Sequence, residues 1–148
     1  MARLETERPV NMKQVNVLIV EDNPGDVLLL QEAMAETGFA CRVSVARDGI
    51  EAIEYLRQSR LAQHSDRPEL IVLDLNLPRM NGRDVLAFIK TDQELAGIPV
   101  LILTSSRADR DIVQLYGLPQ DAYLIKPASF TGYLEVAQLI ENFCEKHL

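Results

Sequence analysis

Polar side chains close four of the apolar runs in this chain, and they are Asp22, Asp74, Thr104 and Lys126. Continuous apolar runs rich in β-branched residues are typical of parallel strands buried on both faces. In open α/β sheets, ligands bind just beyond the carboxyl ends of the strands. The sequence therefore predicts that carboxylates, a hydroxyl and an ammonium group gather at one edge of a sheet.

The carboxylates of this group favour a metal ion. Glu21 and Asp22 follow the first apolar run, and Asp74 follows the third. Three carboxylates this close repel one another unless a proton or a cation lies between them, and a site built from oxygen ligands favours Mg²⁺. We expect Asp22 and Asp74 to bind the ion directly and Glu21 to bind it through water. The backbone carbonyl of Asn76 would complete the protein ligands.

A metal ion beside an aspartate suits phosphoryl transfer. The ion neutralises the phosphoryl oxygens, so that Asp74 can act as a nucleophile and form an aspartyl phosphate. Thr104 can donate its hydroxyl to one phosphoryl oxygen, and Lys126 can pair its ammonium with another. The residue types thus predict that Asp74 accepts a phosphoryl group.

Strands and helices alternate along the chain. Helix caps stand at Asn23, at Asp48 with Glu51, and at Ser129. Five βα units with right-handed crossovers predict an α/β fold with a doubly wound five-stranded parallel sheet, flavodoxin-like order 2-1-3-4-5, and five helices. The expected strands are 15–20, 42–46, 70–73, 100–103 and 122–125, and the helix before the fifth strand is expected over 108–116.

Composition narrows the function classes. A chain of 148 residues suits one domain, and its net charge of -7 repels nucleic acid. No apolar stretch is long enough for a membrane helix, and the N-terminus lacks the apolar core of a signal peptide. We expect a cytoplasmic protein with a polar tail at 1–14 and a single domain at 15–148, without an output domain. Cys41 and Cys144 are expected to be buried thiols.

Over residues 15 to 147 the chain resembles the receiver domain of a two-component response regulator. The matching pieces are VEDN, LDLNLP, LTSS and Lys126-Pro127. The resemblance implies that Asp74 is the phosphorylation site, that Tyr123 is the switch aromatic, and that the peptide bond before Pro127 is cis. It also implies Mg²⁺ as cofactor and a sensor histidine kinase as partner. A receiver is a phosphoacceptor switch rather than a classical enzyme, so the resemblance implies self-phosphotransfer and slow autodephosphorylation as its only reactions.

A narrower resemblance concerns the response regulators of cyanobacterial and bacterial phytochromes. It depends on VEDNPGDVLLLQEA, on DLNLPRMNGRDVLAFIK and on the long polar loop between them. This match implies a phytochrome as the kinase. Two departures from the general pattern are Leu77, where Met is common, and GLPQD, which replaces a turn of small residues.

The final helix carries two apolar stripes. Placing this helix as the resemblance to receivers implies packs one stripe, Tyr133, Ala137, Ile140 and Cys144, on the sheet. The other stripe, Val136, Leu139 and Phe143, then faces outward. An outward stripe of three large apolar residues predicts a homodimer through the fourth helix, the fifth strand and the fifth helix. The alternative is that the tail at 1–14 covers the stripe.

The residues after the first and third apolar runs fit two other functions less well than a phosphoacceptor. A haloacid-dehalogenase-type phosphatase needs an acid or base two residues after its nucleophile, where this chain has Asn76. A flavodoxin-like cofactor site needs a phosphate loop where this chain has Glu21, Asp22 and Asp26. The remaining alternative is a non-phosphorylated scaffold of the same fold that acts by protein binding alone.

Overall fold

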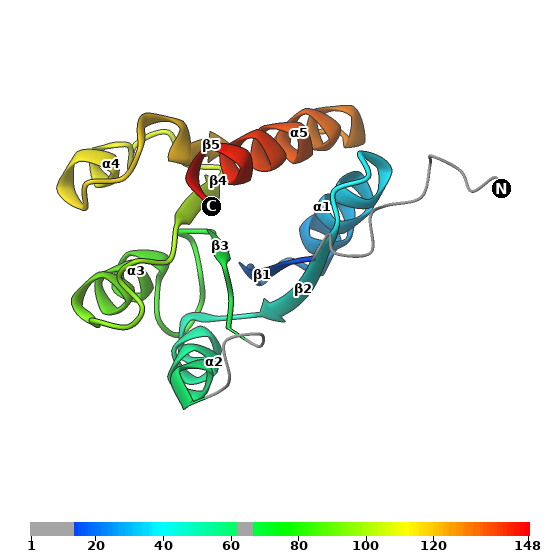
Figure 1. Ribbon diagram of the computed structural model, residues 1–148. Coiled ribbons are helices and arrows are strands. Elements are labelled where there is room, and N and C mark those ends of the chain that lie inside the picture. The colour runs from blue at the N-terminus through cyan, green and yellow to red at the C-terminus, as the bar shows by residue number, and fades with distance from the viewer. Residues whose placement is uncertain (1–13, 62–66) are drawn as a thin grey trace, which may run out of the picture.

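The computed structural model describes residues 14–61 and 67–148, and these form a five-stranded parallel sheet in the order β2-β1-β3-β4-β5 (Figure 1). This is the predicted fold class, which is confirmed. The strands are β1 (Val15–Val20), β2 (Cys41–Ala46), β3 (Leu70–Leu73), β4 (Val100–Thr104) and β5 (Tyr123–Ile125). The helices are α1 (Pro24–Glu36), α2 (Gly49–Leu61), α3 (Gly82–Thr91), α4 (Asp111–Leu115) and α5 (Phe130–His147).

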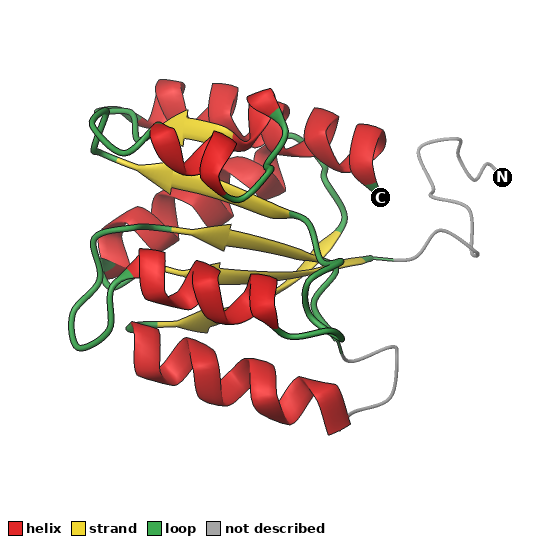
Figure 2. Ribbon diagram, turned by 90° about the vertical axis from the view of Figure 1, so that its left-hand side faces the viewer, coloured by secondary structure: helices red, strands yellow, loops and turns green. Residues whose placement is uncertain are grey.

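Helices cover the sheet on both faces. α1 and α5 pack together on one face, and α2, α3 and α4 lie on the other (Figures 1 and 2). Of the three inner strands, β3 and β4 are buried along their whole length, which explains their unbroken apolar runs. Among the described residues, no helix is long and apolar enough to span a bilayer.

Side-chain caps fix where the helices begin. The Asn23 Oδ1 atom accepts hydrogen bonds from the backbone amides of Gly25 (2.8 Å) and Asp26 (3.1 Å), and Pro24 occupies the first helical position. At α5, the Ser129 Oγ atom accepts from the amide of Gly132 at 3.1 Å. At α2, the Asp48 Oδ1 atom accepts from the Glu51 amide at 2.8 Å, so all three predicted caps are confirmed.

The helix predicted over 108–116 is shorter in the structure. α4 comprises five residues, and Arg110 at its start makes no capping bond through its side chain. Gly117 ends the helix with a φ of 65°, a left-handed conformation that glycine adopts without a steric penalty. Because Gln120–Ala122 then forms a 3₁₀ turn, β5 begins one residue later than predicted.

The outward stripe predicted on α5 is wrong for two of its three members. Val136 and Phe143 are buried at 5% and 2% exposure, whereas Leu139 is 46% exposed. The cause is that α5 packs on α1 as well as on the sheet, so that more of its circumference is covered than one stripe allows. The first stripe is buried as predicted, at Tyr133, Ala137, Ile140 and Cys144. The alternative cover at 1–14 lies, apart from residue 14, outside the described residues.

Candidate functional site

The register of the sheet brings the predicted carboxylates together. Val20 of β1 pairs with Leu73 of β3, so the residues that follow them, Glu21 and Asp74, leave adjacent strands at the same level. The Asp74 amide donates to the Val20 carbonyl at 3.0 Å. Ligand oxygens of Glu21, Asp22 and Asp74 all lie within 4.8 Å of one another. The predicted acidic cluster is therefore present at the carboxyl edge.

The start of α3 supports the backbone of Asp74. The Gly82 amide donates to the Leu75 carbonyl at 2.9 Å. A Cβ atom on Gly82 would lie 2.5 Å from the Leu75 Cα atom and would also overlap the Asp74 carbonyl oxygen. Glycine is thus required at this position for α3 to approach the strand end so closely.

Lys126 enters the cluster from the end of β5. Its Nζ atom lies 2.7 Å from Glu21 Oε1, 2.8 Å from Asp74 Oδ2 and 3.0 Å from Asp26 Oδ2. Burial disfavours the ammonium, but hydrogen bonds to the three carboxylates outweigh it, and the pKa of Lys126 is raised above its ordinary value. Lys126 is therefore a fixed positive charge beside Asp74.

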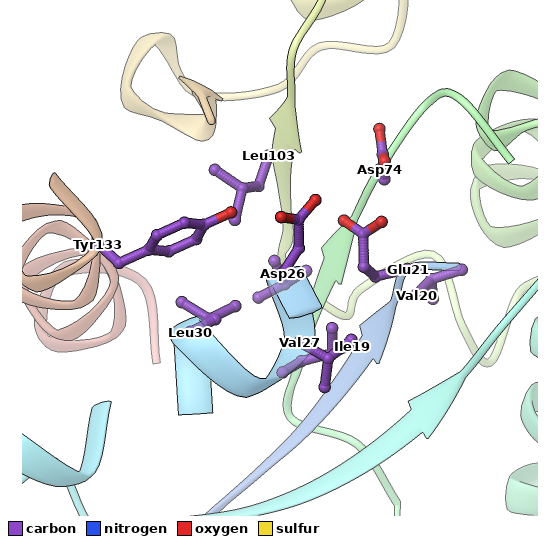
Figure 3. A pocket seen from close by; sticks show the side chains of 10 residues that line it. Ile19, Val20, Glu21, Asp26, Val27, Leu30, Asp74, Leu103 and Tyr133 are labelled. Atoms are coloured by element: carbon purple, nitrogen blue, oxygen red, sulfur yellow. The ribbon is translucent and has the colours of Figure 1, made fainter. Parts of the chain in front are cut away.

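Asp26 was not predicted as a site residue. It is the third residue of α1, and Figure 3 shows its carboxylate beside those of Glu21 and Asp74. The available sequence signal was its place in the first turn of the helix that follows Glu21 and Asp22. That place alone does not distinguish a site residue from an ordinary acid that interacts with the helix dipole.

Glu21 is the most perturbed acid of the cluster. It is 5% exposed, and this burial, reinforced by the charge of Asp74, raises its pKa to about 7. Hydrogen bonds from Lys126 and from the Asn23 amide (3.1 Å) act in the opposite direction without cancelling the effect of burial. Glu21 thus sits where added positive charge is strongly favoured.

The cluster fits a divalent cation. With all four carboxylates ionised, Lys126 leaves a formal charge of -3 on Glu21, Asp22, Asp26 and Asp74. The donors are all oxygens, and Asp22 is exposed, which gives an ion and its waters access from solvent. Both properties suit Mg²⁺.

Asn76 adjoins the cluster through its amide. Its backbone amide donates to Asp74 Oδ1 at 3.1 Å. Asn76 thus lies beside Asp74, in agreement with its predicted place, and its role as a carbonyl ligand stays a prediction.

Thr104 lies beside the cluster and shares a neighbour, Ser106, with Tyr123. Thr104 is fully buried at the end of β4, and its carbonyl accepts from the Lys126 amide at 2.9 Å. Its Oγ1 atom accepts from the Ser106 amide at 3.4 Å, and the Tyr123 hydroxyl donates to the Ser106 carbonyl at 2.6 Å. Ser106 therefore links the predicted hydroxyl donor to the predicted switch aromatic. Their assigned roles stay predictions.

The loop between β4 and α4 is also tied to α3, a feature the sequence did not reveal. Arg83 donates to Asp109 at 3.1 Å and to Asp111 at 2.9 Å, and the Ser106 hydroxyl donates to Asp109 at 2.8 Å. Arg110 places its guanidinium 5.0 Å from the centre of the Tyr123 ring. The loop that carries Ser106 is thus held from two sides.

The predicted cis peptide bond before Pro127 is wrong, because none of the peptide bonds in the described ranges is cis. The trans isomer is favoured by roughly 0.5–1 kcal/mol even before proline. Lys126 reaches all three carboxylates with this bond trans.

Known proteins share this architecture and much of its sequence. A family model described as the response regulator receiver domain matches residues 17–138. Response regulator Rcp1 of Synechocystis sp. is 39% identical over 127 residues, which cover 86% of each protein. The solved structure of the phosphorylated cyanobacterial phytochrome response regulator RcpA is 41% identical, with a TM-score of 0.74, and the match covers 88% of this chain and 94% of that one. The Mn²⁺-bound form of Rcp1 is 37% identical, with a TM-score of 0.72 and coverage of 87% and 93%.

Proposed function

Because this chain belongs to the response regulator receiver family, a family of phosphoacceptor switches, we propose that it accepts a phosphoryl group from a histidine kinase on Asp74. One observation carries this assignment to the residue. The Lys126 ammonium lies 2.8 Å from Asp74 Oδ2, inside a cluster of oxygen donors that suits a divalent cation. The same spot thus has a nucleophile, a fixed positive charge and a metal-binding set.

The transfer step follows from these positions. A carboxylate oxygen of Asp74 attacks phosphorus while the bond from phosphorus to the kinase imidazole nitrogen breaks, and the electron pair returns to that nitrogen. Mg²⁺ held by Asp22, Asp74 and the Asn76 carbonyl, with Glu21 bound through water, would neutralise the phosphoryl oxygens. Lys126 pairs with one phosphoryl oxygen and Thr104 donates its hydroxyl to another. Water later attacks the acyl phosphate slowly and releases phosphate.

The conformational change caused by phosphorylation passes from Thr104 to Tyr123 through Ser106. Thr104 is drawn toward the phosphoryl oxygens, and its movement disturbs the loop whose carbonyl accepts the Tyr123 hydroxyl. Tyr123 can then turn into the space that Thr104 leaves. Phosphorylation thereby biases an equilibrium between two conformations, and a downstream protein reads the face formed by α4, β5 and α5.

A phytochrome is the kinase we expect in a cytoplasmic pathway. This expectation is supported by the similarity to RcpA, which is described as a cyanobacterial phytochrome response regulator. The chain's net charge of -7 disfavours nucleic acid as the downstream target. Transfer rates from phosphorylated phytochrome kinases and from unrelated histidine kinases, measured side by side, test this part of the proposal. Equal rates from both groups would contradict it.

A small phosphodonor tests the phosphoacceptor itself. Incubation with acetyl phosphate and Mg²⁺ should add one phosphoryl group by intact mass, and a chelator should prevent the addition. Asp74→Asn should abolish labelling, because an amide is nearly isosteric but not nucleophilic. Asp84→Asn is a matched control away from the cluster and should label normally. Labelling of the Asp74 variant at the wild-type level would refute the assignment.

The alternative is a scaffold that signals by binding alone. It would take no phosphoryl group from acetyl phosphate or from any kinase, with its fold and metal site intact. The labelling experiment separates the two functions. A phosphoacceptor forms an acyl phosphate, which hydroxylamine cleaves, whereas a scaffold forms no such adduct.

Self-association through α4, β5 and α5 is a separate hypothesis. It now depends on isolated apolar side chains, because Leu139 is exposed on α5 and Leu115 is 65% exposed on α4. Leu139→Glu should convert a dimer into monomers in sedimentation. A wild-type protein that is monomeric at tens of micromolar, with and without a phosphoryl analogue, would contradict the hypothesis.

A further inference from the structure

Asp26 contacts the reaction centre without having a place in the transfer step. Its Oδ2 atom lies 3.0 Å from Lys126 Nζ, and the two residues are 100 positions apart in the sequence. The Asp26 side chain is 29% exposed, so most of it is buried. The Asp26 carboxylate therefore has a specific partner in addition to its position at the start of the helix.

The same helix position elsewhere gives the ordinary case. Asp84 is the third residue of α3, and its amide donates to the capping Asn81 at 3.0 Å, as the Asp26 amide does to Asn23 at 3.1 Å. Both acids interact with the helix dipole. Asp84 is exposed, whereas Asp26 turns toward Lys126. The contact with Lys126 is thus what distinguishes Asp26.

A second observation shows that Asp26 faces the interior. Tyr133 of α5 is 1% exposed and lines the same cavity as Asp26 and Asp74 (Figure 3). Within the described part of the chain, the Tyr133 hydroxyl has no hydrogen-bond partner. Burial, followed by the charge of Asp26, raises the pKa of Tyr133 to about 12. The charge of the Asp26 carboxylate thus acts on Tyr133, a buried side chain between α1 and α5.

The three carboxylates that contact Lys126 differ in their other roles. In the proposed function, Asp74 becomes the acyl phosphate and Glu21 serves the metal ion through water. Asp26 is the carboxylate that stays available to Lys126 before and after transfer. A buried ammonium needs such a partner to remain charged and in one place.

Building on the proposed phosphoacceptor function, we propose that Asp26 is a positioning residue, which holds the Lys126 ammonium against Asp74 from the side of α1. Asp26 then acts through Lys126 and touches neither the phosphoryl group nor the metal ion. Its removal should lower the rate of transfer at saturation without changing the half-saturating concentrations of donor and Mg²⁺.

Phosphorylation kinetics in a double-mutant cycle test the proposal. With saturating acetyl phosphate and Mg²⁺, Asp26→Ala should slow labelling roughly tenfold and Asp26→Asn roughly threefold, since the amide still accepts a neutral hydrogen bond. The control Asp84→Ala should stay within about twofold of the wild type. In a Lys126→Ala background, Asp26→Ala should have no further effect, because a positioning residue acts only through its target.

A second measurement does not depend on phosphorylation. NMR of the Lys126 side chain in the metal-free protein should show faster exchange of the ammonium protons in Asp26→Ala, and unchanged exchange in Asp84→Ala. Wild-type rates in Asp26→Ala, an equal loss in the Lys126→Ala background, or unchanged ammonium exchange would each overturn the proposal. If the wild type takes no phosphoryl group at all, the proposed function fails, and the exchange measurement still decides whether Asp26 holds Lys126.

Discussion

Alanine substitutions at three glycines should change the free energy of unfolding by different amounts, because each glycine is subject to a different steric constraint. Alanine at Gly82 would place a Cβ atom 2.5 Å from the Leu75 Cα atom, against backbone that has no room to rotate away. Alanine at Gly117 meets nothing within 4 Å but must adopt a φ of 65°. Alanine at Gly97 meets nothing within 4 Å, and its φ lies outside the left-handed range.

The expected sizes follow from these geometries. Overpacking against backbone typically costs about 1–3 kcal/mol, and Gly82→Ala should fall in the upper half of that range. A left-handed conformation costs a residue with a Cβ atom roughly 1–2 kcal/mol, which sets the loss for Gly117→Ala. Gly97→Ala should be neutral or stabilising by up to about 1 kcal/mol, since alanine reduces the entropy of the unfolded chain.

Urea denaturation followed by circular dichroism measures all three. With an m-value of about 2 kcal/mol/M, Gly82→Ala should lower the midpoint by about 1 M and Gly97→Ala should leave it unchanged or higher. Phosphorylation of the folded protein should also slow more in Gly82→Ala than in Gly97→Ala, because the overlap falls on the Asp74 carbonyl. A Gly82→Ala midpoint equal to that of Gly97→Ala would refute the claim that α3 fixes the strand end.

Three other outcomes can be checked independently. Asp22→Ala should reduce Mg²⁺ affinity at least roughly tenfold and Glu21→Ala less, by NMR titration, since Glu21 is assigned to water-mediated binding; equal losses would contradict the assignment. Tyr133→Phe should leave the unfolding free energy unchanged or raise it by about 1 kcal/mol, because the buried hydroxyl has no partner in the described structure, and a loss above that size would reveal a bond. Burial raises the pKa of the Cys144 thiol from 9.0 to about 12, so the folded protein holds this proton more tightly than the unfolded chain. The resulting stability is complete below pH 9 and is lost as the pH rises toward 12, so unfolding free energies over that window should fall more steeply in the wild type than in Cys144→Ala.

The sequence alone was sufficient for the layout of the fold. Apolar β-branched runs, helix caps such as Asn23 and Ser129, and the alternation of strand and helix are local signals, readable from neighbouring residues. The chirality of βα crossovers then leaves few ways to order five strands. Together these rules predict that Glu21, Asp74 and Thr104 lie at one edge of the sheet.

Contacts between distant elements were decided only by the tertiary structure. Asp26 meets Lys126 across 100 positions because the start of α1 and the residue that follows β5 both lie at the carboxyl edge of the sheet. Val136 and Phe143 are also buried in the fold, although their spacing suggested an outward stripe. Periodicity states which residues share a face of a helix, but the number of neighbours around that helix determines how many faces are covered.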